Sequence, residues 1–207
     1  MYSELIWDFD GTLFDTYPIS GANFAECILK EYGAIEDISE IIRHMKDSFG
    51  EAMAFYAGKY GFDDDFCRRF YDINDTRTPK IAKPLEGVPE ILRFAVENGC
   101  RNYLYTHRNI LTLNILRENG LIEYFTDFIT SADNFERKPA PDALEYLAKK
   151  HSLNKDLCLM IGDREIDVLA AKNARMHGCL IPDDPSLPTC ADHVIRNISE
   201  LKDIITK

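Results

Sequence analysis

Two aspartates two residues apart, Asp8 and Asp10, follow a short apolar segment near the N-terminus, and Gly11 and Thr12 come directly after them. In an extended chain, side chains at this spacing point to the same side. Two adjacent carboxylates repel each other unless one holds a proton or a cation lies between them. The pair therefore suits a metal-binding nucleophile beside a proton donor, and Gly11 lets the backbone turn tightly near a bound anion. An N-terminal turn that is merely rich in Asp and Gly is the alternative.

A second polar group, Thr106-His107-Arg108, follows another apolar segment. The Thr106 hydroxyl can donate to a phosphate oxygen, or it can cap a helix, as Asn109 can. Arg108 is a candidate ligand for a phosphate or carboxylate, although a solvated surface position is the expectation we favour. His107 is a further candidate for substrate binding, although we favour a structural or surface role for it.

Two further groups complete the set of candidate site residues. Lys138 lies between Arg137 and Pro139, and the nearby prolines stiffen the chain so that its amine is held in a set direction. Its ammonium would offset negative charge gathered around a phosphate, whereas a solvated loop lysine is the alternative. Asp163 and Asp167 are one helical turn apart and would complete an oxygen-ligand site for Mg²⁺, unless they only favour a helix N-terminus.

Apolar segments alternate with helical patterns in much of the chain. Near-continuous apolar segments predict buried strands at 5–9, 102–106, 127–130, 157–161 and 177–181, with a weaker one at 193–195. Helices are predicted between them, at 88–96, 110–116, 141–148 and 166–170. This alternation predicts an α/β fold with a doubly wound parallel sheet. Such sheets bind ligands at the carboxyl ends of their strands, where all the polar groups described above would lie.

Residues 16–84 interrupt the alternation with successive helical patterns. These patterns end before Gly33, cover 38–45, end before Gly61, and cover 66–71 ahead of Pro79. A helical domain inserted between the first and second strands is the simplest account. We therefore expect an α/β core made of residues 1–15 and 85–207 and a helical cap made of residues 16–84.

Composition and charge disfavour nucleic-acid-binding, membrane-spanning and secreted proteins. The 207 residues carry a net charge of −11, which disfavours nucleic-acid polymers as partners but leaves a small phosphorylated metabolite possible beside a metal ion. No apolar stretch suits a membrane span, and no secretory signal is visible. The six cysteines are widely spaced, so we expect reduced thiols, no zinc site and a cytoplasmic protein. The oligomeric state is left open.

The four polar groups, in this order and each at a strand end, resemble the motifs of the haloacid dehalogenase-like (HAD) superfamily. More narrowly, the chain resembles its phosphatases with a helical cap, such as phosphoglycolate phosphatases. The resemblance covers essentially the whole chain and implies a Rossmann-like core and a Mg²⁺ cofactor. It implies the following roles: Asp8 as nucleophile, Asp10 as general acid/base, Thr106 and Lys138 as phosphate-binding residues, and Asp163 and Asp167 as metal carboxylates. Many members have Ser where this chain has Arg164.

The resemblance also implies a mechanism. Asp8 attacks phosphorus while Mg²⁺, held by Asp8, the Asp10 backbone carbonyl and Asp163, offsets charge repulsion. Asp10 then protonates the leaving alcohol and later activates the water that cleaves the aspartyl-phosphate. The cap would close over the cleft and select the organic part of the substrate.

Proteins of the same fold also have activities other than phosphate-ester hydrolysis. Dehalogenases and phosphonate hydrolases lack an Asp at the position of Asp10 and are disfavoured. A phosphomutase stays open, although Asp47–Glu51 resembles the cap loop of the phosphatases more closely than that of β-phosphoglucomutases. The third alternative is a non-catalytic regulatory or binding protein with the same core. Relatives that have lost activity usually lack one of the carboxylates or the lysine, whereas this chain has all of them. Candidates for substrate selection are Phe14, Asp15, Tyr17, Arg43, His44 and Phe49; phosphoglycolate, sugar phosphates and nucleotides all stay open as substrates.

Overall fold

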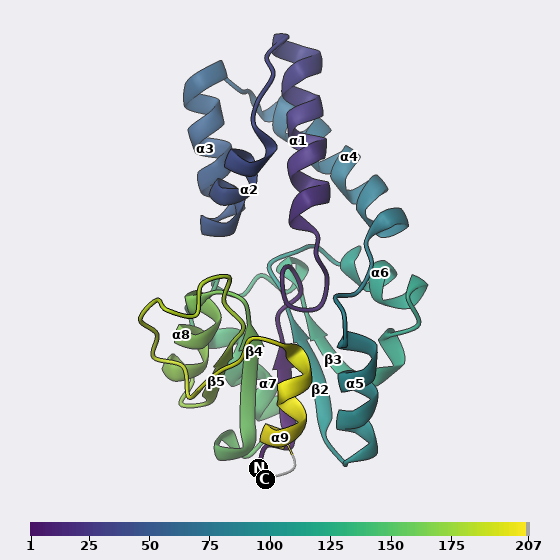
Figure 1. Cartoon of the computed structure of the whole chain (residues 1–207), viewed down its shortest axis with the longest axis vertical. Helices are drawn as coiled ribbons and strands as arrows, with labels where there is room; N and C mark the ends of the chain where they lie inside the picture. Colours follow the sequence, from purple (N-terminus) through teal and green to yellow (C-terminus); the bar gives the residue numbers. More distant parts are fainter. Residues whose placement is uncertain (206–207) are drawn as a thin grey trace. The chain divides into compact units, whose positions relative to one another are not determined.

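In the computed structural model, which describes residues 1–205, six strands form one parallel sheet in the order β3-β2-β1-β4-β5-β6 (Figure 1). The strands are β1 Glu4–Trp7, β2 Arg101–Tyr105, β3 Phe125–Ile129, β4 Cys158–Gly162, β5 His177–Leu180 and β6 His193–Val194. Each predicted strand is present within two residues of its expected position. The central strand β1 is buried along its whole length, as its apolar sequence predicts.

Helices flank this sheet; four of them match the helices predicted at 88–96, 110–116, 141–148 and 166–170, and the one at Leu201–Ile205 was not predicted. They are α5 Val88–Glu97, α6 Thr112–Glu118, α7 Asp142–His151, α8 Glu165–Asn173 and α9 Leu201–Ile205, with short 3₁₀ turns η1 Ile122–Tyr124, η2 Ser131–Asp133, η3 Lys155–Leu157 and η4 Ile198–Glu200. Ile6, Tyr103 and Met160 project from one face of the sheet into a buried cluster with α7 and α8. Helix α5 contacts β2 and also α9 (Figure 1). The α/β fold with a doubly wound parallel sheet is thus confirmed.

The chain divides into two compact units. The first contains Met1–Phe14 and the chain from Lys83 onward, and the second is Asp15–Ala82. Pro84 belongs to the first unit because it pairs with Phe14, next to a hydrogen bond from the Leu85 amide to the Leu13 carbonyl. The expected cap boundaries, 16–84, therefore lie slightly further along the chain than the observed division.

The second unit consists of four helices, α1 Tyr17–Tyr32, α2 Ile38–Asp47, α3 Phe49–Tyr60 and α4 Asp64–Ile81. Gly33 and Gly61 end α1 and α3 in the left-handed conformation, as expected of glycines at these positions. Helix α4 contains Pro79 and ends two residues later, as expected where a proline removes a backbone hydrogen bond of the helix. The aromatic ring of Phe24 lies at the centre of the unit's core and contacts the rings of Tyr56, Phe62, Phe66 and Phe70.

One expected loop of this unit is absent. Only Ser48 separates α2 from α3, and its side chain accepts a hydrogen bond from the Glu51 amide. Ser48 is an N-cap in extended conformation, so the segment Asp47–Glu51 is a helix junction and not the loop that the sequence suggested.

All six cysteines are free thiols. Within residues 1–205, each helix is too short or too polar to cross a lipid bilayer.

Candidate active site

Three neighbouring strands bring the first candidate residues together. Asp8 follows β1, Thr106 follows β2 and Asp163 follows β4, while β1 pairs in parallel with both β2 and β4. The carboxyl ends of parallel neighbours lie at one edge of the sheet, so three residues far apart in sequence meet there.

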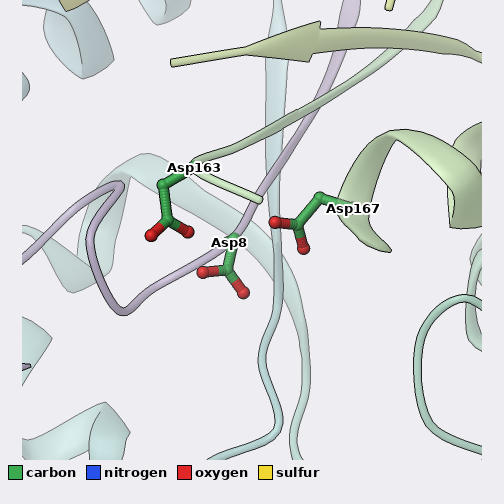
Figure 2. Close-up of side chains that lie close together, drawn as sticks. All are labelled: Asp8, Asp163 and Asp167. Carbon is green, nitrogen blue, oxygen red and sulfur yellow. The ribbon is translucent and has the colours of Figure 1, made fainter. Parts of the chain in front are cut away.

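Asp8, Asp163 and Asp167 form an acidic cluster at this edge (Figure 2). One carboxylate oxygen from each lies within 4.8 Å of the others. Gly162 makes room for the cluster, because a Cβ at this position would lie 2.3 Å from the carboxyl carbon of Asp167. Asp8 and Asp167 are buried, and Asp163 is nearly so.

Burial and mutual repulsion both oppose ionisation of this cluster. Burial is the larger cause of the rise in the pKa of Asp8 from 3.8 to about 6, with Asp167 adding to it and Lys138 opposing it. The pKa of Asp163 is also raised, by burial and then by the charges of Asp8 and Asp167. Carboxylates in this state are favourable positions for a cation.

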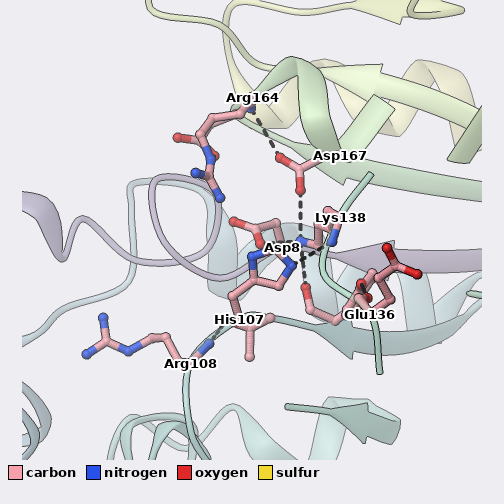
Figure 3. Close-up of polar contacts among 10 residues, drawn as sticks. Asp8, His107, Arg108, Glu136, Lys138, Arg164 and Asp167 are labelled. Carbon is pink, nitrogen blue, oxygen red and sulfur yellow. Dashed lines mark hydrogen bonds and ion pairs between the residues drawn. The ribbon is translucent and has the colours of Figure 1, made fainter. Parts of the chain in front are cut away.

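Lys138 connects two members of the acidic cluster (Figure 3). Its Nζ donates to Asp8 Oδ1 at 2.5 Å, to Asp167 Oδ1 at 2.8 Å and to the Tyr105 carbonyl at 2.9 Å. Three N–H donors therefore meet three acceptors. Burial favours the neutral amine, but Asp167 and Asp8 outweigh it and raise the pKa of Lys138. The lysine is a buried cation, and the alternative of a solvated loop residue is wrong.

The oxygens of the cluster differ in what they can still bind. Within the part of the chain that the structure describes, Asp8 Oδ2 and Asp163 Oδ1 are buried and accept no hydrogen bond. Both oxygens of Asp167 are engaged, one by Lys138 and the other by the Arg164 backbone amide at 3.2 Å. Two orphaned buried carboxylate oxygens fit a small, hard cation such as Mg²⁺. A cation bound here would have Asp8 and Asp163 as its best-placed direct ligands, while both oxygens of Asp167 already accept hydrogen bonds.

Asp10 lies apart from this cluster and pairs with a different cation. Its Oδ1 accepts a hydrogen bond from Arg108 at 2.7 Å, and only 12% of the arginine side chain is exposed. The expectation of a solvated surface Arg108 is therefore wrong. The backbone path from β2 to α6 turns the guanidinium toward the Asp10 loop, which the sequence pattern does not encode.

The remaining candidates lie in the same two loops. Thr106 Oγ1 accepts a hydrogen bond from the Arg108 amide, so its own hydroxyl hydrogen can be donated elsewhere. It does not cap a helix, because α6 begins several residues later. Gly11 has a φ of 78° and donates its N–H to the Phe14 carbonyl, so it shapes the turn after Asp10. His107 accepts a hydrogen bond from the backbone N–H of Lys138.

Two participants were not predicted from the sequence. The Tyr105 carbonyl binds Lys138, and no sequence signal could have identified one carbonyl among many. Gly162 did carry a signal, since a glycine inside an apolar strand often marks a close approach of another group.

Comparison with known proteins decides the family. A profile of the family described as haloacid dehalogenase-like hydrolase matches residues 5–181. The chain belongs to this family. The resemblance inferred from the motifs is thereby confirmed.

Individual relatives of this HAD hydrolase carry phosphatase names. A phosphoglycolate phosphatase of Vibrio vulnificus (strain YJ016) is 34% identical over 53% of this chain and 47% of that protein. The chain thus spans about half the length of this curated relative. Pyrophosphatase PpaX of Halalkalibacterium halodurans is 26% identical over 98% of this chain and 96% of that protein. The crystal structure of a hydrolase from Streptococcus pneumoniae TIGR4 is 30% identical, with a TM-score of 0.67, over 99% of this chain and 98% of that one.

Proposed function

We propose that this HAD hydrolase is a Mg²⁺-dependent phosphatase that cleaves small phosphate esters through an aspartyl-phosphate on Asp8. The observation that carries the proposal is that the two oxygens of Asp8 have different environments. Lys138 holds Oδ1, while Oδ2 is buried without a hydrogen bond from any described residue. A carboxylate held in place by an ion pair can offer one oxygen to a cation and the other to phosphorus, which suits a nucleophile.

The chain's own residues would divide the reaction as follows. An oxygen of Asp8 forms a bond to phosphorus as the bond from phosphorus to the alcohol oxygen breaks, and Asp10 gives that alcohol oxygen a proton. Water then attacks phosphorus, Asp10 takes a proton from it, and inorganic phosphate leaves Asp8. Thr106 and Lys138 would stabilise the phosphoryl oxygens. When bound by Asp8 and Asp163, Mg²⁺ would supply further charge neutralisation.

Arg108 would orient the Asp10 carboxyl group during these two steps, because its guanidinium donates a hydrogen bond to one of the carboxyl oxygens.

We also propose that the helical unit, Asp15–Ala82, is a cap domain that supplies substrate selectivity. Phosphoglycolate, sugar phosphates and nucleotides are the ester classes to compare, followed by inorganic pyrophosphate, which is a phosphoanhydride. The names of the relatives support the first and the last of these.

The test is phosphate release from a panel of these compounds, with Mg²⁺ or with excess EDTA. Wild type should turn over at least one compound only with Mg²⁺, and Asp8→Asn should lose that turnover by a factor of about 10³ or more. Asp127→Asn is the matched control, because Asp127 pairs with Lys150 and His151 at β3, outside the acidic cluster.

Two other outcomes would point to the competing activities. Interconversion of sugar phosphates without net phosphate release would indicate a phosphomutase. A folded wild type that turns over none of the compounds would favour the regulatory reading. A hydroxylamine-sensitive phosphoenzyme, absent from Asp8→Asn, would separate covalent catalysis on Asp8 from direct attack by water.

A further inference from the structure

His107 connects the loop after β2 to the segment that carries Lys138. Its Nε2 accepts a hydrogen bond from the backbone N–H of Lys138 at 2.9 Å (Figure 3). The imidazole also lies edge-on to the ring of Tyr105, with centroids 5.9 Å apart. His107 is partly buried, so its ring is held by protein contacts on more than one side.

The direction of this hydrogen bond fixes the chemical state of the ring. A backbone N–H can only donate, so Nε2 must be unprotonated and the single ring hydrogen must lie on Nδ1. The surroundings agree with a neutral ring. Burial, followed by the charges of Lys138, Arg137 and Arg164, lowers the pKa of His107 to about 2. A neutral ring with Nε2 already engaged is not suited to proton transfer.

The Lys138 amide depends on this contact. Other hydrogen bonds reach its segment, from the Tyr105 hydroxyl to the Glu136 carbonyl at 3.4 Å and from the Asn173 side chain to the Pro139 carbonyl at 2.9 Å, but they engage carbonyls and leave the Lys138 amide to the imidazole. The residues between η2 and α7 belong to no helix or strand, so no ladder satisfies the Lys138 amide. Pro139 follows, and its nitrogen carries no hydrogen to donate. A buried amide without a partner is costly, so the segment would shift if the imidazole were removed.

The tip of β2 therefore holds Lys138 at two points. His107 binds its backbone amide, and the Tyr105 carbonyl binds its side-chain Nζ. Between these points the lysine stem is fixed, which directs Nζ onto Asp8 and Asp167. Thr106, the candidate phosphate-binding residue, lies between the two contact residues in sequence. The phosphate-binding loop and the lysine are thus fixed to each other.

We propose that His107 is a positioning residue that, as a neutral imidazole protonated on Nδ1, fixes the Lys138 backbone and thereby the amine against Asp8 and Asp167. The catalytic consequence rests on the proposed function, whereas the contact itself does not. His107 does not transfer protons in this role. Any side chain that places a neutral acceptor at the position of Nε2 should replace it.

The test compares two substitutions with opposite expectations. His107→Gln can place its amide oxygen near the position of Nε2, whereas His107→Leu removes the acceptor. We expect kcat to fall by about 10- to 100-fold in His107→Leu with KM changed less than about threefold, because the lysine is misplaced while the binding loops remain. His107→Gln should recover kcat to within a few-fold of wild type. His151→Leu, which removes a hydrogen bond to Asp127 elsewhere in the same unit, is the control for general loss of packing.

A second readout needs no turnover. Nitrogen-15 NMR of the wild-type imidazoles should show His107 neutral and protonated on Nδ1 between pH 5 and 8, and hydrogen exchange of the Lys138 amide should be faster in His107→Leu than in His107→Gln. A protonated ring, a hydrogen on Nε2, or equal exchange in both variants would overturn the proposal. If wild type hydrolyses no phosphate ester, only the proposed function fails, and the NMR result still decides the contact.

Discussion

The Nζ of Lys138 lies 2.5 Å from Asp8 Oδ1, and both side chains are almost wholly removed from solvent. A buried ion pair is stable only when each partner keeps the other and its hydrogen bonds are satisfied. Here Asp167 and the Tyr105 carbonyl complete the environment of the amine. The pair therefore holds the proposed nucleophile in place and compensates part of the negative charge in the acidic cluster.

Replacing Lys138 with methionine should damage both stability and activity. The substitution keeps a similar volume but leaves Asp8 and Asp167 without their common cation, which costs about 3–5 kcal/mol when one partner of a buried pair is lost. Urea unfolding in the presence of EDTA measures the loss, and Mg²⁺ should restore part of it. Lys172→Met is the control, because Lys172 forms a more exposed pair with Asp192 and should cost at most about 1 kcal/mol. Equal losses in the two variants would contradict the prediction.

Asp8→Asn should make the metal-free protein more stable at neutral pH. Because the pKa of Asp8 is raised from 3.8 to about 6, the folded state holds its proton more tightly than the unfolded state. Stability therefore falls as the pH rises from about 4 to about 6 and stays low above that range. Lys138 keeps Asp167 and the Tyr105 carbonyl as acceptors, so removing the Asp8 charge should stabilise the metal-free protein by roughly 1–3 kcal/mol at pH 7 and hardly at all at pH 4.

Asp127→Asn is a control for which we expect the opposite change in folding stability at pH 7. Burial raises the pKa of Asp127, but hydrogen bonds from His151 and Lys150 outweigh it and lower the pKa overall. Its ionised form thus stabilises the fold above the unfolded-state pKa, and the substitution should destabilise the protein at pH 7. Urea unfolding of both variants with EDTA at pH 4 and pH 7 makes the comparison. A metal-free Asp8→Asn that is less stable than wild type at pH 7 would refute the account of the cluster.

Much of the site could be predicted because parallel strands bring their carboxyl ends together. Apolar segments identified the strands, and Asp8, Thr106 and Asp163 each follow one of them. The sequence did not predict that Arg108 pairs with Asp10 or that His107 binds the Lys138 amide. These contacts depend on the path of irregular loops, which leaves no periodic pattern in the sequence.

Asp167 shows a related limit. Its spacing from Asp163 predicted two carboxylates on one side, and both are in the acidic cluster. The spacing could not show that both oxygens of Asp167 are engaged by Lys138 and the Arg164 amide, since that depends on long-range packing. The proposed distinction between direct and indirect metal ligands therefore rests on hydrogen bonds that the sequence does not predict.

The neutral state of His107 predicts a sensitivity of the fold to acid. Its pKa of about 2 in the folded protein lies far below the usual value of 6.5, so the unfolded state takes up a proton that the folded state does not. Wild type should lose about 1.4 kcal/mol per pH unit below pH 6.5 relative to His107→Gln. Urea unfolding between pH 7 and pH 5 measures the slopes. His107→Leu should show the same flatter slope, and a wild-type slope in either variant would be inconsistent with a neutral buried ring.

Arg164 should weaken metal binding, because its Nε lies 4.0 Å from Asp163 Oδ1. Removing a positive charge beside a metal ligand should favour cation binding by roughly 1 kcal/mol or more, so Arg164→Ser should bind Mg²⁺ at least about fivefold more tightly. Calorimetric titration with Mg²⁺ measures the affinity directly. Arg196→Ser changes the net charge equally at an exposed position and should leave the affinity near that of wild type. Weaker binding by Arg164→Ser would mean that the guanidinium orients the ligands more than it repels the ion.

Gly162→Ala should disrupt the acidic cluster through a single methyl group. The added Cβ would lie 2.3 Å from the Asp167 carboxyl carbon and Oδ2, so Asp167 must move and Lys138 loses one of its three acceptors. Overpacking of this kind costs about 1–3 kcal/mol, and we expect kcat to fall by at least about tenfold because the amine is no longer fixed. Gly58→Ala is the matched control: Gly58 lies within α3 with no atom near its would-be Cβ, so the substitution should stabilise the helix by about 0.5–1 kcal/mol. Thermal unfolding of the two variants should therefore shift in opposite directions. If Gly162→Ala keeps wild-type stability and turnover, the contact between Asp167 and Lys138 is not needed to fix the amine.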